Sequence, residues 1–176
     1  MIAQDPIAPE DAVTAGFLQS IALAVADAYD KVMPLLGDTT KPTAASFQGH
    51  HKEHADALAK RAGTSAATVP NAALTLVLAA RLQAVSDERG ALAFASALEN
   101  QVTGTYAFTF TTLTSPDVIH LAATILPVVS GHAAILGSSA GLTTNAMFPN
   151  GALQSTTVAD GSDTTLGFDP LSFPAG

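Results

Sequence analysis

The apolar residues of this chain recur at helical spacing in four long segments. The first segment begins at Pro9 and ends near Pro34 and Gly37. Its apolar stripe comprises Leu18, Ile21, Ala22, Val25, Ala28, Val32 and Leu36. The second segment ends at Gly63, and its stripe comprises Phe47, His51, His54, Ala55, Leu58 and Ala62. A shorter Ala- and Leu-rich helix is predicted over residues 72–85, where it would lie within a long connection between the second and third long helices.

The third segment follows a helix N-cap signal at Ser86 and Asp87. Its inward stripe is predicted to be Leu92, Ala95, Glu99, Val102, Tyr106 and Leu113. Residues 103–112 are rich in β-branched and aromatic side chains, so a strand is the alternative for this half of the segment.

The fourth segment begins with Ser115 as the predicted cap and Pro116 as the first helical residue. Gly141 is predicted to end the helix, and Pro127 is predicted to kink it. The inward residues are predicted to be Val118, Leu121, Ile125, Val129, His132 and Leu136.

Three regions are therefore predicted: a leader over residues 1–10, a four-helix bundle over 11–142, and an extended tail over 143–176. The tail is rich in Thr, Ser, Gly and Pro but keeps spaced apolar residues, which unstructured segments rarely do. We predict that it docks onto another copy of the protein, which makes the protein a homo-oligomer; docking onto its own bundle is the alternative. The predicted anchors are Phe148, Phe168, Leu171 and Phe173.

Composition narrows the functional classes. The net charge is −8, and Arg89 is the last Lys or Arg in the chain. Nucleic-acid-binding proteins need clustered Lys and Arg, so this charge argues against that class. No run of about 18 apolar residues is present, so no membrane insertion is predicted. Without cysteine, any metal must bind through His and carboxylates. The N-terminus fits a cytoplasmic protein and equally an exported one whose signal has been removed.

Four polar residues break the apolar pattern, because each falls on the stripe that its own helix should bury. They are His51, His54, Glu99 and His132. A buried carboxylate is costly unless it is paired or binds a cation, and imidazoles are suitable partners. The sequence predicts these four residues as metal ligands, with satisfied core polar groups as the alternative. His50 and His120 lie on the flanks of their stripes and are predicted to be surface residues or to support the ligands from behind.

The order of helices and the segments 50–58, 97–106 and 126–137 resemble the ferritin-like domain family, especially its exported bacterial branch. In di-metal members of that family, two helices each give a Glu and two give a Glu-x-x-His pair. The resemblance implies that His51 and His54 match one such pair with His in place of Glu, while Glu99 and His132 match two further ligands. Val129 stands where a carboxylate is expected, and the first helix offers none around Ala22.

The resemblance therefore implies an all-α, ferritin-like four-helix bundle with a degenerate di-metal site. Three imidazoles and one carboxylate suit a single zinc, copper or iron ion better than two irons. The predicted function is a non-catalytic protein that binds one such ion. The alternative is a structural, self-assembling protein that uses the bundle as a scaffold and the tail as its intersubunit contact.

Overall fold

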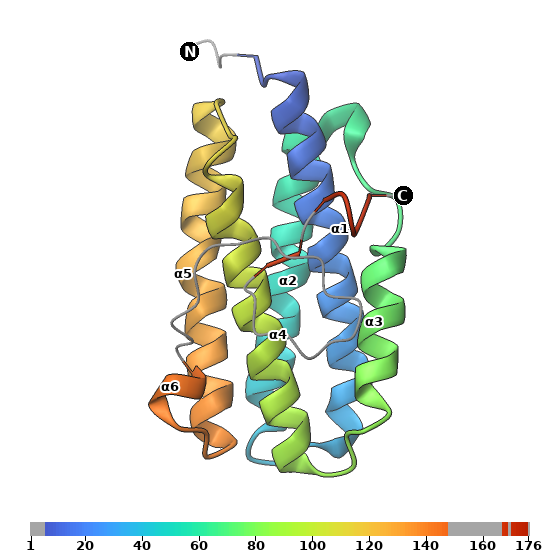
Figure 1. Cartoon of the computed structure of the whole chain (residues 1–176), viewed down its shortest axis with the longest axis vertical. Helices are drawn as coiled ribbons and strands as arrows, with labels where there is room; N and C mark the ends of the chain where they lie inside the picture. Colours follow the sequence, from blue (N-terminus) through green and yellow to red (C-terminus); the bar gives the residue numbers. More distant parts are fainter. Residues whose placement is uncertain (1–5, 148–166, 169, 176) are drawn as a thin grey trace.

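A computed structural model describes residues 6–147, 167–168 and 170–175 of the chain. This part of the protein is all-α, as predicted, and it contains four long helices (Figure 1). They are α1 (Pro9–Val32), α2 (Lys41–Ala62), α4 (Glu88–Thr109) and α5 (Pro116–Ser139). Short helices complete it: α3 (Ala72–Leu82), α6 (Thr144–Met147), η1 (Met33–Leu35) and η2 (Gly63–Ser65).

The long helices pack as two antiparallel pairs, α1 with α2 and α4 with α5 (Figure 1). Helices α2 and α4 run in the same direction, so the chain must return along the length of the bundle between them. Helix α3 lies in this connection and packs against α1. The predicted long crossover with a short helix is therefore confirmed.

Helix ends follow the predicted signals at several positions. The Asp87 carboxylate accepts a hydrogen bond from the Gly90 N–H and caps α4. Gly63 and Gly141 have left-handed φ values of 57° and 69°, which glycine adopts at little cost where a helix stops. Helix α5 continues through Pro127.

The structure decides two local points that the sequence left open. Residues 103–109 are helical, which confirms the predicted third helix over its strand alternative, because burial of Tyr106 and Thr109 in the bundle outweighs the β propensity of this segment. Ser115 is the N-cap residue of α5 and Pro116 its first residue, as predicted, but the Ser115 side chain makes no capping hydrogen bond. Its hydroxyl accepts instead from the Ala8 N–H, and its own N–H donates to Asp11, so this residue joins the start of α1 to the α4–α5 turn.

Gly16 lets α1 approach the turn after α2 closely. A Cβ atom on Gly16 would lie 2.1 Å from the backbone oxygen of Ser65, which no side-chain adjustment can relieve. We expect Gly16→Ala to destabilise the protein by about 1–3 kcal/mol, the usual range for overpacking. Urea unfolding measures this difference in the free energy of unfolding.

Gly49 is the matched control for that substitution, because it also lies inside a helix but a Cβ there meets no atom within 4 Å. Gly49→Ala should raise the stability by about 0.5–1 kcal/mol through the lower entropy of the unfolded chain. Equal effects of the two substitutions would contradict the close contact at Gly16.

The described end of the tail packs against the protein's own bundle. Phe168 is only 3% exposed, and its N–H donates to the Thr105 hydroxyl on α4. The Asn71 side chain donates to the carbonyl oxygens of Phe173 and Pro174. Phe168 and Phe173 therefore anchor the segment in the way that the alternative prediction describes. Leu171 is 91% exposed, and Phe148 lies outside the described residues, so docking onto a second copy stays a prediction.

Two described helices are long and apolar enough, by length and composition, to cross a membrane. They are Pro9–Leu35, of which 72% of the most apolar stretch is buried in the bundle, and Pro116–Ser139, of which 33% is buried. The search for an uninterrupted run of 18 apolar residues did not find these two helices, because both interleave Ala, Gly, Ser and Thr with larger apolar residues. Core helices of soluble proteins pass the same test.

Candidate metal centre

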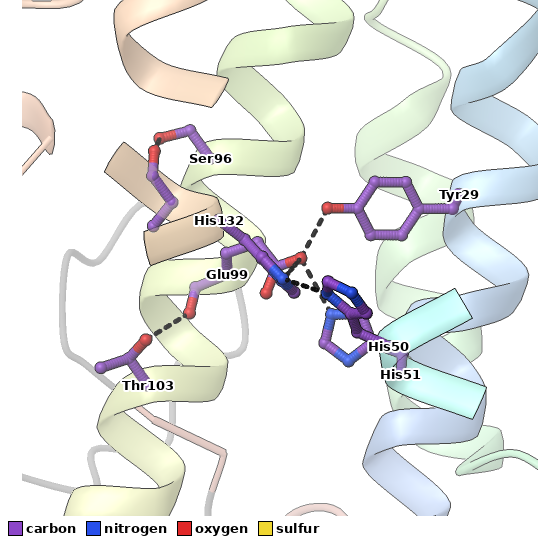
Figure 2. Close-up of polar contacts among 8 residues, drawn as sticks. Tyr29, His50, His51, Ser96, Glu99, Thr103 and His132 are labelled. Atoms are coloured by element: carbon purple, nitrogen blue, oxygen red, sulfur yellow. Dashed lines mark hydrogen bonds and ion pairs between the residues drawn. The ribbon is translucent and has the colours of Figure 1, made fainter. Parts of the chain in front are cut away.

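Glu99 occupies the middle of the bundle, where its side chain is completely buried (Figure 2). Helix α4 carries it inward on the same stripe as Leu92, Ala95 and Val102, all of which are buried. Its Oε1 accepts a 2.5 Å hydrogen bond from the Tyr29 hydroxyl, and His51 Nε2 lies 2.9 Å away. Its Oε2 is also buried but has no hydrogen-bond partner in the described structure. One oxygen of this carboxylate is thus fully engaged and the other is left open.

The two imidazoles beside Glu99 come from the two neighbouring helices. His51 of α2 and His132 of α5 are 1% and 3% exposed. His132 Nδ1 lies 3.4 Å from Glu99 Oε1, an ion-pair distance that leaves this nitrogen without a hydrogen bond of its own. One ligand atom from each of the three residues lies within 4.8 Å of the others. The structure therefore brings three of the four predicted residues together.

His54, the fourth predicted residue, lies at the edge of this group. It is half-buried, its ring centroid is 5.8 Å from that of His51, and its buried Nδ1 has no hydrogen-bond partner. Its role as a metal ligand stays a prediction. His120 is exposed on α5, which agrees with its predicted surface position.

Tyr29 and His50 contact the site; the sequence analysis did not identify Tyr29, and it placed His50 on the flank of its stripe, either at the surface or behind the ligands. Tyr29 comes from α1, so all four long helices contribute to the polar group. His50 Nδ1 lies 2.9 Å from His132 Nε2, which places His50 behind a predicted ligand. Tyr29 is absent from the predicted stripe of the first helix, whereas His50 lies behind His132 as one of its two predicted placements allows. Tyr29 follows Val25 by four residues, so a wider predicted stripe would have included it.

Burial and neighbouring charges shift the pKa values of the acidic groups in the site. Burial alone would raise the pKa of the Glu99 carboxyl, but the charge of His51 and polar contacts with both imidazoles lower it to about 2. Burial and the Glu99 charge raise the pKa of Tyr29 well above its usual value, and the same two causes raise that of Tyr106. The site therefore holds an ionised carboxylate next to two neutral phenols.

These residues fit a metal ion. Two imidazole nitrogens and one carboxylate oxygen form a donor set that binds zinc, copper and iron. The unpartnered atoms Glu99 Oε2 and His132 Nδ1 are buried polar groups of the kind that a ligand normally satisfies. Val129 and Ala22, at the positions where the family pattern expects further acids, are buried apolar residues. The charge that a pair of metal ions requires is thus not supplied at these two positions.

A family model for the ferritin-like domain matches residues 11–142. The chain belongs to the ferritin-like domain family. No curated protein and no solved structure gives a significant match to it. The two helix pairs and the long crossover are those of a ferritin-like bundle, and the His51, Glu99 and His132 group lies inside this ferritin-like domain.

The pKa of His54 gives the ferritin-like domain a testable pH dependence. Burial, followed by the charges of His51, His132 and His50, lowers this pKa from 6.5 to about 4. Between these values the unfolded chain binds a proton that the folded protein does not, so stability falls as the pH falls from 6.5 through 4. Because His54 is only half-buried, we expect a contribution of about 1–2 kcal/mol, less than the full shift implies.

His54→Gln should therefore flatten the pH dependence of unfolding over this range. Urea unfolding with a chelator present, at pH 7, 5.5 and 4, measures the effect without metal. His120→Gln is the control, since that imidazole is exposed and should leave the profile unchanged. A His54→Gln profile parallel to the wild type would show that His54 does not lose its proton on folding.

Proposed function

We propose that the protein binds a single transition metal ion, such as zinc, copper or iron, through His51, Glu99 and His132, and that it is not a di-iron oxidase. The observation that carries the proposal is the buried Glu99 carboxylate, whose Oε2 has no partner although two imidazoles lie beside it. Leaving such an atom unsatisfied costs about 1–3 kcal/mol, and a bound cation would remove this cost.

His54 is the proposed fourth ligand. It lies one helical turn after His51 on α2, and its Nδ1 is buried without a partner. A change of side-chain rotamer would direct this imidazole toward the ion without moving the helix. His51, His132 and His54 would then supply nitrogen and Glu99 oxygen, a set of four that closes the coordination of a zinc ion.

Metal analysis of the purified protein, followed by thermal unfolding with added zinc, tests the proposal. Neutral imidazole binds metal and imidazolium does not, so the zinc-dependent rise in Tm should be larger at pH 8 than at pH 5. A protein that contains no metal, and whose Tm is unchanged by zinc at both pH values, would overturn the proposal.

A second proposed function, self-assembly, is supported by the outer face of α5. Asp117 is the only residue of the helix with a formal charge at neutral pH, and Val128 and Ile135 are 38% and 49% exposed. Soluble monomers rarely leave large apolar patches uncovered. Light scattering of the wild type and of Ile135→Glu tests this function: assembly that the substitution disrupts supports it, and a wild type that is monomeric at all concentrations contradicts it.

A further inference from the structure

The ring of His132 is held on three sides, and this arrangement bears on the proposed metal site. Its Nδ1 faces Glu99 Oε1 at 3.4 Å, while its Nε2 lies 2.9 Å from Nδ1 of His50 (Figure 2). Phe47 stacks on its face, with ring centroids 3.9 Å apart and planes 18° apart. The stacking fixes the plane of the ring, so that Nδ1 is directed at the Glu99 carboxylate and Nε2 at His50.

An ion shared by Glu99 and His132 must bind Nδ1, because that nitrogen faces the carboxylate. A neutral imidazole carries one proton, so the proton must then be on Nε2. A buried N–H needs an acceptor, and the atom within hydrogen-bond distance is His50 Nδ1. For His50 to accept, its own proton must be on its Nε2.

We propose that His50 is a positioning residue of the metal site: it accepts the Nε2–H of His132 and so keeps the Nδ1 lone pair directed at the ion. The inference rests on the proposed function. It assigns to an imidazole the role that a carboxylate or a backbone carbonyl commonly has behind a metal-binding histidine. His50 touches neither the ion nor Glu99 in this arrangement, so its effect on metal binding passes through His132.

Two substitutions of His50 distinguish the effect of its hydrogen-bond acceptor from the effect of its side-chain volume. In His50→Asn, the amide oxygen is bonded to Cγ, as Nδ1 is in histidine, so an acceptor stays near the same place. His50→Leu keeps a branched side chain but removes the acceptor. We expect His50→Leu to weaken zinc binding about 10–100-fold, the usual cost of losing such a partner, and His50→Asn to stay within about threefold of the wild type.

Competition with a chromophoric zinc chelator measures these affinities, and His120→Leu on α5 is the control for loss of an exposed imidazole. Nitrogen-15 NMR of the zinc-loaded wild type gives a second readout, which does not depend on whether the Leu variant folds. The His132 ring should show a protonated Nε2 and a metal-bound Nδ1.

Each outcome bears on a different claim. Equal zinc affinity of the Asn and Leu variants, or a His132 ring protonated at Nδ1 in the zinc-loaded protein, would overturn this inference and leave the metal site standing. A wild type that binds no zinc would overturn the proposed function and the inference with it.

Discussion

Glu99→Gln should abolish the rise in Tm that zinc produces in the wild-type protein. At a zinc concentration 100 times the Kd, binding stabilises the folded state by about 2.7 kcal/mol. For a chain of this length, each kcal/mol shifts Tm by about 2–4 °C, so the wild type should gain about 5–10 °C. The Gln side chain keeps the shape of Glu99 and an acceptor for the Tyr29 hydroxyl, but it removes the negative charge.

Differential scanning calorimetry with and without zinc measures the effect of Glu99→Gln. Glu53→Gln is the control, because Glu53 is exposed on α2 and its loss changes the net charge equally. The control should keep the full zinc-dependent rise. If Glu99→Gln also kept it, the ion would bind elsewhere on the protein.

Phe168→Ala is expected to lower the free energy of unfolding by about 3–5 kcal/mol, the usual cost of removing a buried phenylalanine side chain. Phe168 belongs to the hydrophobic core although it lies beyond the four long helices, and its ring contacts that of Phe173 edge to face. Its loss would leave a cavity beside the Phe173 ring and Thr105 of α4.

Leu171→Ala provides the comparison for this effect, because that side chain is 91% exposed in the same segment. It should change stability by less than about 0.5 kcal/mol. Urea unfolding of both variants decides the matter. If Phe168→Ala lowered the free energy of unfolding as little as Leu171→Ala is expected to, the segment would contribute little to the stability of the folded state.

The fold could be predicted from sequence because helical periodicity is strong in all four segments. The stripe of α1, for example, includes Leu18, Ile21 and Val25, and all three are buried. The second half of α4 could not be decided in this way. Its Thr residues favour strands when considered alone, and only packing against the rest of the bundle selects the helix.

The site was predictable as far as polar residues stood out on apolar stripes. Glu99, His51 and His132 did so, and the structure places them together. Tyr29 and His50 could not be recognised by that rule. Tyr29 lies beside the predicted stripe of α1 and resembles an ordinary core aromatic, and His50 contacts His132 from the flank of α2, where the direction of a side chain depends on its rotamer.

The contact of residues 168, 173 and 174 with the bundle affects where the boundary of the folded domain should be drawn. Similarity to the ferritin-like family ends at residue 142, yet the aromatic ring of Phe168 lies in the core and Asn71 is bound to the backbone of residues 173 and 174. The boundary of homology and the boundary of the folding unit are therefore different. An expression fragment cut at the homology boundary would expose the surface that Phe168 covers and leave Asn71 without two of its acceptors. Fragments for structural work should extend through residue 175.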